Sequence, residues 1–399
     1  MDSENLILIK KDSHLKIEDI AKFHRASNSK VQIDYKLQEK INLNRSYLDD
    51  KINSGSDIYG VTTGFGNSAS NRISPNLSSE LQKNLIAYHG VGVGPYLNER
   101  DCKATLLVRM NCNARGYSGV SWELLQQMGR FLDHGITPAI PELGSVGASG
   151  DLTPLSYLGA ALCGERNVYY NGEIVPTNQV LRQLGIAPYK LKPKEGLAIM
   201  NGTSVMTGIL ANTWDQVNRA VDVSCKIIPL MVEVMKGRSS PFHSRVHELK
   251  PHPGQGRIAN EIYRRINNAE HRLGRRDSIE GQVEYGKAEK YRIQDSYSIR
   301  CAPQVLGTLA DALEWTKGLI ETEMNSVNDN PLIDDEKDLI LNAGHFYGGH
   351  MAMVADTLKP LVANLGALLE RQLGILIDER LNGSIPANLV AKKDLGNNS

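Results

Sequence analysis

Apolar residues in the first part of the chain recur at the spacing of an α-helix. Four of them lie one or two helical turns apart: Leu37, Ile41, Leu48 and Ile52. The pattern stops at Asn53-Ser54-Gly55, residue types that end helices, and segments rich in glycine, serine and threonine follow. We therefore expect residues 1–119 to form a smaller α-rich region that carries functional loops.

From Trp122 onward, long helical patterns dominate the chain. One pattern runs to about Val327 and ends at the sequence Asn-Asp-Asn-Pro, residues 328–331, which is a clear stop signal. Another, strongly apolar, covers residues 351–377. The exception is the segment 168–175, where an Asn-Gly pair between β-forming residues predicts a two-residue hairpin.

Composition limits the classes of function. Of the 399 residues 41% are hydrophobic, which suffices for a sizeable core, and 45 Lys and Arg balance 45 Asp and Glu. This balance predicts no partner among nucleic acids, and no apolar run is long enough to predict a membrane span. The first residues lack the layout of a secretion signal, so we expect a cytoplasmic protein. Five scattered cysteines without a C-x-x-C pair indicate reduced, mostly buried thiols.

Three histidines have a spacing that suggests a metal site: His243, His247 and His252. No carboxylate or cysteine completes an accepted ligand pattern, and two prolines interrupt the helix that would present the first pair. The sequence therefore favours a surface loop here and predicts no metal.

Small residues gather in residues 141–164, PELGSVGASGDLTPLSYLGAALCG. Glycines space out serine and alanine, and then Asp151 and Pro154 open an apolar helical run. A loop of this kind is often a plain connector, because glycine permits turns and aspartate or threonine caps helices.

The string Ala148-Ser149-Gly150 resembles the motif of the aromatic amino-acid ammonia-lyase and aminomutase family. There an Ala-Ser-Gly tripeptide cyclises on its own backbone into a methylidene-imidazolone (MIO) electrophile, so the resemblance implies no external cofactor. The residue types suit this chemistry: the nitrogen of Gly150, unobstructed by a Cβ, must reach the carbonyl carbon of Ala148, and Ser149 loses its hydroxyl as water. The resemblance implies that Asp151 helps to move protons.

The loop at residues 58–70, IYGVTTGFGNSAS, is similar to the mobile inner loop of that family. Such a loop could also cradle a phosphate, but no Gly-Lys-Ser/Thr ending follows. The resemblance implies that Tyr59 is the general base of the reaction.

Residues 81–95, LQKNLIAYHGVGVGP, contain a glycine run that could suggest dinucleotide binding, but the run follows a helical pattern instead of a strand. The family resemblance implies that Tyr88 and His89 line the pocket for the substrate side chain.

The sequence Asn201-Gly-Thr-Ser204 stands within apolar surroundings, where polar side chains need partners. The resemblance implies that Asn201 contacts the MIO group or the substrate amine. Histidine-specific relatives tend to carry glutamine where this chain has Ser204, which favours phenylalanine or tyrosine as substrate.

A phenol and a guanidinium lie three residues apart in the segment 294–304, QDSYSIRCAPQ. The resemblance implies that Tyr297 steadies the substrate, with Gln294 alongside, and that Arg300 binds the substrate carboxylate through its planar pair of donors. In a later family string His345 replaces the usual asparagine, and Phe346 is the expected aromatic wall.

The resemblance covers residues from about 59 to about 388 and implies a mainly α-helical fold. Long antiparallel helices would form a central bundle over residues 120–399, with the N-terminal region folded over one end. It also implies a homotetramer whose active sites draw on three chains. Relatives continue beyond residue 399, so we expect a truncated or partial chain with an exposed apolar groove.

Three functions stay open on the sequence alone. The first is an ammonia-lyase that gives cinnamate, coumarate or urocanate, the second is an aminomutase that returns ammonia to the β-carbon, and the third is an incomplete, weakly active or non-catalytic chain. Tyr88 and His89 favour a phenol or an imidazole, and Ser204 argues against imidazole, so tyrosine ranks slightly ahead of phenylalanine and histidine.

Overall fold

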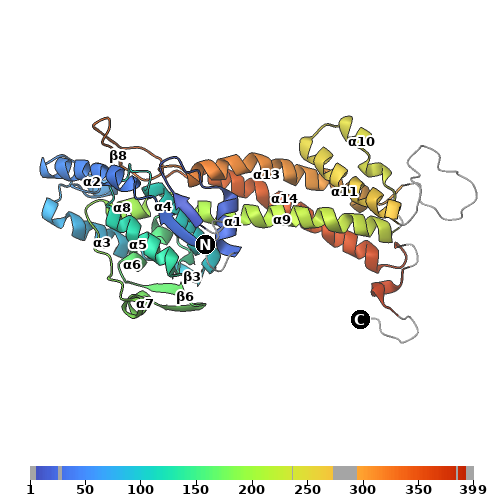
Figure 1. Ribbon diagram of the computed structural model, residues 1–399, viewed down its shortest axis with the longest axis horizontal. Helices are drawn as coiled ribbons and strands as arrows, with labels where there is room; N and C mark the ends of the chain where they lie inside the picture. Colours follow the sequence, from blue (N-terminus) through green and yellow to red (C-terminus); the bar gives the residue numbers. More distant parts are fainter. Residues whose placement is uncertain (1–5, 26–28, 236, 273–293, 383–384, 392–399) are drawn as a thin grey trace, which may run out of the picture. The chain divides into compact units, whose positions relative to one another are not determined.

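The computed structural model describes residues 6–25, 29–235, 237–272, 294–382 and 385–391 (Figure 1). It divides into two compact units. The first contains residues up to Asp215 together with Gly318–Ala352, and the second contains Gln216–Lys317 and the residues from Met353 onward. The domain boundary that we expect at residue 119 stays a prediction.

The first unit is built mainly from helices that pack around buried apolar side chains. Its helices are α1 (Ile17–Arg25), α2 (Leu37–Asn53), α3 (Ser78–Tyr88), α4 (Glu99–Asn113), α5 (Trp122–Asp133), α6 (Leu152–Leu162), α7 (Thr177–Leu184) and α8 (Glu195–Met200). Short 3-10 turns lie at Gly66–Ser68 and Pro75–Leu77. The helix that the sequence predicts to end at residues 53–55 is confirmed as α2.

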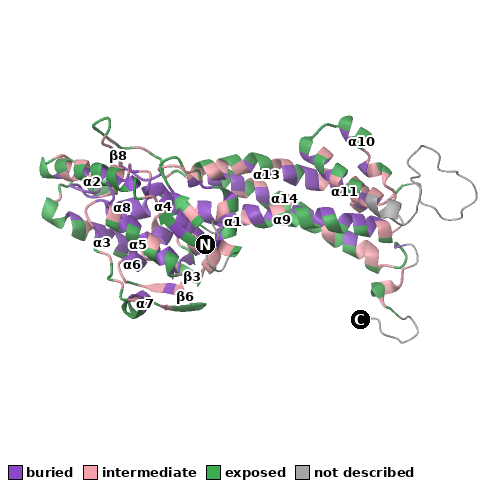
Figure 2. Ribbon diagram, in the orientation of Figure 1, coloured by how far each residue is buried: buried purple, intermediate pink, exposed green. Residues whose placement is uncertain are grey.

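Helices α4 and α6 form the centre of this unit (Figure 2). Every residue of α4 from Ala104 to Asn113 is buried, and so is every residue of α6 from Thr153 to Leu162. Helix α5 begins where the Ser121 hydroxyl accepts a hydrogen bond from the backbone N–H of Leu124. A buried centre of this kind holds the loops at the ends of α6 and α8 in fixed positions.

The strands of the first unit are short. β1 (Leu6–Ile9) and β2 (Lys30–Ile33) pair in parallel, and β3 (Val93–Tyr96) pairs with β5 (Pro141–Leu143). β4 (Thr137–Pro138), β6 (Asn167–Tyr170) and β7 (Glu173–Pro176) form a three-stranded antiparallel sheet. β8 (Leu332–Asp334) pairs with β9 (Leu339–Leu341).

The predicted hairpin at residues 168–175 is confirmed as the pair β6 and β7. Its turn residues Asn171 and Gly172 have φ values of 52° and 81°. Two successive positive φ angles are what a two-residue hairpin turn needs, and asparagine followed by glycine tolerates them best.

The second unit contains helices and connecting turns, and no strand among its described residues. It contains α10 (Ser244–Glu248), α11 (Pro253–Arg272), α12 (Tyr297–Arg300), the 3-10 turns Ser240–Phe242 and Ala387–Leu389, and the larger parts of α9 (Ser204–Val234), α13 (Ala302–Met324) and α14 (Gly349–Ile377). Glycines allow α11 and α13 to approach closely, because a Cβ at Gly307 would overlap the backbone of Gln255. The mainly α-helical fold class is thereby confirmed.

Helix α14 corrects one expectation. By length and composition it could cross a membrane, so the statement that no apolar run is long enough was wrong. The helix passes a test of length and mean hydropathy although Pro360 and the charged pair Glu370-Arg371 lie within it, so its apolar residues do not form one unbroken run. The same test is passed by helices of soluble bundles, so it does not identify a membrane span.

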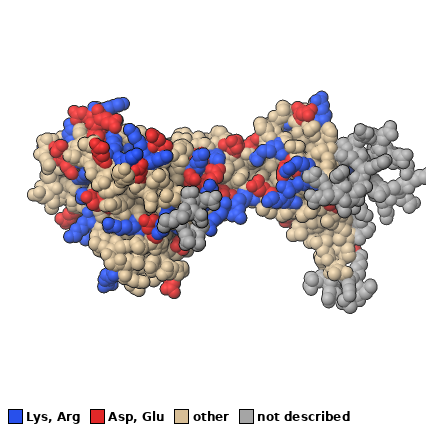
Figure 3. Space-filling view, viewed as in Figure 1, with Lys and Arg blue, Asp and Glu red and all other residues tan. Residues whose placement is uncertain are grey.

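Charged side chains of both signs are interspersed on the face shown in Figure 3. This mixture agrees with the balance of 45 basic and 45 acidic residues in the sequence. The cysteines are unpaired, and three of them are buried: Cys102, Cys112 and Cys225. Burial raises the pKa of the Cys102 thiol to about 12, which keeps it protonated and unreactive.

Candidate active site

The tripeptide Ala148-Ser149-Gly150 occupies a tight turn in front of helix α6. Ser149 has a φ of 54° and Gly150 a φ of 80°, both in the left-handed region that disfavours residues with a Cβ. A Cβ at Gly150 would overlap the carbonyl oxygen of Gly202 and lie 2.9 Å from the carbonyl oxygen of Phe346. Only glycine fits at position 150, and Ser149 beside it holds a backbone conformation that residues with a Cβ seldom adopt.

Asn201 lies directly against this turn. It ends helix α8, and its Nδ2 donates a hydrogen bond of 3.1 Å to the carbonyl oxygen of Ser149. Gly150 and Gly202 also form an isolated parallel β-bridge. The structure therefore brings together Asn201 and the tripeptide, two features that the sequence placed in one site. Within the described ranges, the buried Oδ1 of Asn201 has no hydrogen-bond partner.

Asp151 links the tripeptide to the start of helix α9. Its backbone N–H donates to the carbonyl oxygen of Gly202 at 2.8 Å, and its Oδ2 accepts from the backbone N–H groups of Val205 and Met206, each at 3.0 Å. Burial raises the pKa of the Asp151 carboxyl from 3.8 to about 6, although the two N–H donors and Arg109 act in the opposite direction. A carboxyl in this state can give or take a proton near neutral pH.

Arg109 is a central residue that the sequence analysis did not identify. It is fully buried on α4, and its Nη2 donates to the carbonyl oxygens of Ala198 and, at 2.7 Å, of Asn201. Its Nη1 donates to Asn328 Oδ1 at 2.7 Å and its Nε to the Ala198 carbonyl at 3.0 Å. One guanidinium thus fixes the end of α8 and the turn that follows it.

Asn328 and Thr203 continue this network. Asn328 Nδ2 donates to the Thr203 hydroxyl at 2.9 Å, and that hydroxyl donates to Glu323. The neighbouring Asp329 forms an ion pair with Lys194, and both side chains are fully buried. The sequence pattern identified residues 328–331 as a helix stop, and side chains of this segment also anchor the candidate site. The sequence did contain an indication of this network, because arginine and asparagine within apolar helical stretches need buried hydrogen-bond partners.

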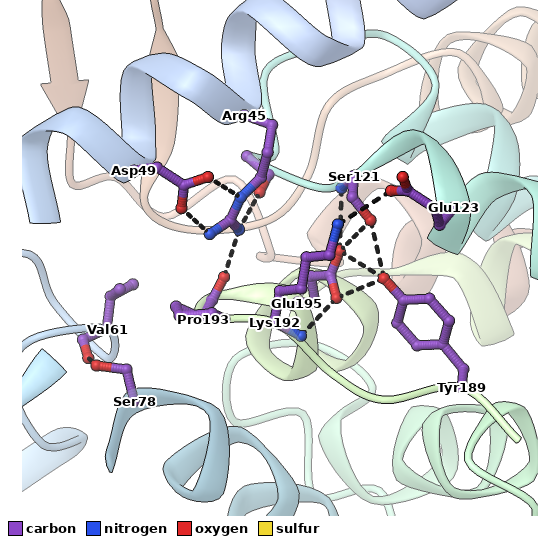
Figure 4. Close-up of polar contacts among 11 residues, drawn as sticks. Arg45, Asp49, Val61, Ser78, Ser121, Glu123, Tyr189, Lys192, Pro193 and Glu195 are labelled. Atoms are coloured by element: carbon purple, nitrogen blue, oxygen red, sulfur yellow. Dashed lines mark hydrogen bonds and ion pairs between the residues drawn. The ribbon is translucent and has the colours of Figure 1, made fainter. Parts of the chain in front are cut away.

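The segment that leads into α8 is held by a second polar network (Figure 4). Glu195 accepts hydrogen bonds from the Ser121 hydroxyl at 2.8 Å and from the Tyr189 hydroxyl at 2.9 Å. Arg45 on α2 donates to the carbonyl oxygen of Pro193 at 2.7 Å and is paired with Asp49. These contacts fix the segment that leads into α8, at the end of the helix opposite to Asn201.

Tyr59 is half-buried on the predicted inner loop, between α2 and α3. Its hydroxyl accepts a hydrogen bond from the backbone N–H of Gly66 at 3.1 Å, and its ring meets Phe65 edge to face. The buried Gln82 fastens the loop to α8, because its amide donates to the Gly60 carbonyl at 2.8 Å and accepts from the Leu197 N–H at 3.0 Å.

Tyr88 and His89 lie at the C-terminal end of α3. Tyr88 is 55% exposed, the two ring centroids are 4.5 Å apart, and His89 Nδ1 is 2.9 Å from the carbonyl oxygen of Leu85. Burial raises the pKa of the Tyr88 hydroxyl, and the electrostatic effect of the nearby Tyr59 raises it further. The predicted specificity residues and the predicted base therefore lie in one region of the first unit.

Phe346 is half-buried, and its carbonyl oxygen faces Gly150 as described above. His345 next to it is exposed. Gly348 lies against Met206 in the first turn of α9, where any Cβ would overlap the Met206 sulfur. The segment around residue 346 is therefore brought to the tripeptide, as the resemblance implied. Ser204, in contrast, is fully buried and accepts a hydrogen bond from Arg109 at 3.4 Å.

The remaining predicted residues belong to the second unit. Tyr297 and Arg300 form the single turn of α12, and the Arg300 guanidinium lies 4.3 Å from the centre of the Tyr297 ring. Tyr297 is 73% exposed, and Gln294 is exposed as well. Their place beside the tripeptide stays a prediction.

The three histidines of the metal hypothesis do not come together as ligands in the described part of the chain. His247 is buried, with Nε2 3.0 Å from the carbonyl oxygen of Pro241 and Nδ1 2.9 Å from Gln255 Nε2. Among the described residues, no group of three or more histidine, cysteine, aspartate or glutamate side chains could hold a metal ion.

A model of the family described as aromatic amino acid lyase matches residues 15–399. The chain belongs to this family. Probable histidine ammonia-lyase of Thermoplasma volcanium is 37% identical over 92% of the chain and 70% of that relative. Phenylalanine ammonia-lyase of Nostoc punctiforme is 37% identical over 87% of the chain and 61% of that relative.

A solved structure, the phenylalanine aminomutase of Pantoea agglomerans, has the same fold with a TM-score of 0.87 and 32% identity. The comparison covers 97% of this chain and 75% of that one. The chain therefore spans between 61% and 75% of the length of the relatives described here. The family is one of carbon–nitrogen lyases, and its members named here include both ammonia-lyases and an aminomutase.

Proposed function

We propose that this chain is an ammonia-lyase that removes ammonia from an aromatic L-amino acid. The observation that carries the proposal is the tripeptide turn: Gly150 fits only without a Cβ, Ser149 is held in the left-handed region, and Asn201 donates to the Ser149 carbonyl. This geometry suits the cyclisation of Ala148-Ser149-Gly150 into an MIO group, with no external cofactor.

The cyclisation needs a bond between the Gly150 nitrogen and the Ala148 carbonyl carbon. One water carries away the carbonyl oxygen, and a second carries away the Ser149 hydroxyl with its α-hydrogen. The group so formed would supply an electrophilic methylene that serves as an electron sink for the reaction. The Asn201 amide, which donates to the Ser149 carbonyl oxygen, would stabilise negative charge that develops on that oxygen.

The other residues act on the substrate. Tyr59 removes a proton from the β-carbon, the electron pair forms the new double bond, and ammonia leaves from the α-carbon to give an arylacrylate. Arg300 binds the carboxylate through two parallel N–H donors, with Tyr297 and Gln294 beside it. Phe346 and Tyr88 enclose the ring, and His89 supplies a polar contact to it.

Tyrosine is our first choice of substrate, ahead of phenylalanine and histidine. Tyr88 and His89 are adjacent, and both offer a polar atom to a phenol or an imidazole. Ser204 supports this order less than the sequence suggested, because its hydroxyl is buried against Arg109.

An aminomutase is the second candidate. It is favoured by the likeness to the Pantoea agglomerans phenylalanine aminomutase. A mutase would return ammonia to the β-carbon of the same acrylate, so the residues named above would serve both reactions.

We also propose that the active protein is a homotetramer. Apolar side chains are exposed along one face of α9: Val223, Ile227, Leu230 and Val234. Their spacing repeats every three to four residues, the pattern of a helix face that packs against another helix. A second copy of the chain would cover this stripe. A cytoplasmic location stays a prediction of the sequence.

Incubation with tyrosine, phenylalanine and histidine tests the function. We expect release of ammonia and the ultraviolet absorbance of the arylacrylate, with the highest kcat/KM for tyrosine. Ser149→Ala protein is the matched control, because it lacks only the hydroxyl that must leave. Accumulation of a β-amino acid would identify the mutase instead. Neither product from any of the three substrates would refute both candidates.

A further inference from the structure

Arg109 does more than fill a buried position on α4. Among its acceptors are the carbonyl oxygens of Ala198 and Asn201, at the last turn of α8, and the side-chain oxygen of Asn328. All of these groups lie in the first unit. The guanidinium therefore joins the end of α8 to Asn328, which is distant from it in the sequence: Nε and Nη2 bind the α8 carbonyls, and Nη1 binds Asn328.

The turn held by Arg109 is the one that faces the tripeptide. Gly202 lies between them: a Cβ there would overlap both Arg109 Nη1 and Asn328 Oδ1. On the other side of Gly202, its carbonyl oxygen accepts a hydrogen bond from the Asp151 N–H. A Cβ at Gly150 would overlap this same oxygen. A displacement of the guanidinium would therefore move Gly202, and with it the carbonyl oxygen that packs against Gly150.

The same displacement would affect the Asn201 amide. Arg109 binds the Asn201 carbonyl at 2.7 Å, while the Asn201 side chain donates to the Ser149 carbonyl at 3.1 Å. Main chain and side chain of one residue therefore connect the guanidinium to the tripeptide. No protein atom other than Asn201 Nδ2 is shown donating to that carbonyl in the described ranges.

We propose that Arg109 is the positioning residue for tripeptide cyclisation: through the Asn201-Gly202 turn it holds the Ser149 carbonyl and Gly150 in the conformation from which the ring closes. This inference rests on the proposed function. Arg109 does not touch the substrate or the reacting atoms. It acts by keeping the turn in one conformation before and during ring closure.

The test measures dehydration of the tripeptide, which a merely structural role would not change. Wild-type, Arg109→Met, Arg109→Lys and Arg45→Met proteins are purified, checked for helical circular dichroism and cooperative melting, and digested. Samples are taken at a series of times after synthesis, and mass spectrometry of each sample gives the dehydrated fraction of the peptide that contains Ser149 and hence the rate of dehydration. Arg45 is a matched control, because it is also buried and binds loop carbonyls, of Gly119 and Pro193, away from the tripeptide.

We expect the rate of dehydration in Arg109→Met to fall by about tenfold or more, as the loss of a charge-assisted hydrogen bond predicts. Arg109→Lys should recover part of the rate, because an ammonium can still bind one or two of the carbonyls. Arg45→Met should lose stability but be fully dehydrated. Full and equally rapid dehydration in Arg109→Met would overturn the proposal while leaving the proposed function intact.

A second variant covers the case in which Arg109→Met does not fold. Asn328→Ala keeps the arginine but removes the acceptor that fixes Nη1 beside Gly202. We expect a folded protein with a lower melting temperature, because Nη1 loses its buried acceptor, in which dehydration is slowed several-fold. Wild-type rates in this variant would contradict the proposal. A wild-type protein without any dehydration would refute the proposed function, and the role of Arg109 with it.

Discussion

Asp151 gives a quantitative prediction because its carboxyl is buried and yet bonded to the first turn of α9. Burial raises its pKa from 3.8 to about 6. A difference of about 2 pKa units corresponds to about 3 kcal/mol between its protonation states. In Asp151→Asn, the amide oxygen can accept the same two N–H bonds from Val205 and Met206, so the change removes the charge and keeps the acceptor.

The sign of the effect follows from proton binding. Since the folded pKa is the higher one, the folded protein binds the Asp151 proton more tightly than the unfolded chain does. The contribution of this proton to the stability of the folded protein is fully present below about pH 4 and is lost as pH rises through about 6. Relative to Asp151→Asn, the aspartate protein should therefore become less stable by about 3 kcal/mol between about pH 4 and about pH 8.

The comparison is best made in Ser149→Ala protein, which cannot cyclise. Both members of the pair then carry the same unmodified tripeptide. Urea unfolding followed by circular dichroism, at a series of pH values, gives the difference in unfolding free energy between Ser149→Ala and Ser149→Ala/Asp151→Asn. Parallel pH profiles, whose difference stays within about 1 kcal/mol, would refute the inference that this carboxyl is destabilised by burial.

Three further predictions concern single residues. Tyr59→Phe should abolish most turnover but leave tripeptide dehydration complete, and ordinary activity in steady-state assays would exclude it as the base. Gly150→Ala should leave the tripeptide uncyclised, because a Cβ overlaps the Gly202 carbonyl, and a dehydrated peptide in mass spectrometry would contradict this. Lys194→Met should lower the unfolding free energy by about 3–5 kcal/mol, since Asp329 would remain buried without its cation; urea unfolding with a loss below about 1 kcal/mol would disagree.

Local sequence patterns predicted the local structure well. The end of α2 and the hairpin of β6 and β7 depend on residues that are adjacent in the sequence, and both are confirmed. The proximity of Asn201 to Ser149 came from the family motif, because no spacing rule places residues fifty positions apart in contact. The fold class follows from both kinds of information.

The supporting network could not be predicted in the same way. Arg109 and Asn328 are 219 positions apart, and each alone looks like an ordinary polar residue in or after a helix. Ser204 shows the opposite limitation: its motif position suggested a preference for phenylalanine or tyrosine as substrate, but its hydroxyl is buried against Arg109. Periodicity identifies the face that is buried, but it does not identify the distant partner.

The central claim is that Ala148-Ser149-Gly150 becomes the electrophile of the enzyme. Intact mass spectrometry of the denatured wild-type protein, followed by peptide mapping, tests it without any assumption about the substrate. The account predicts a mass two waters below that of the sequence, with the whole loss in the peptide that contains Ser149. An unmodified mass for folded, purified protein would contradict it.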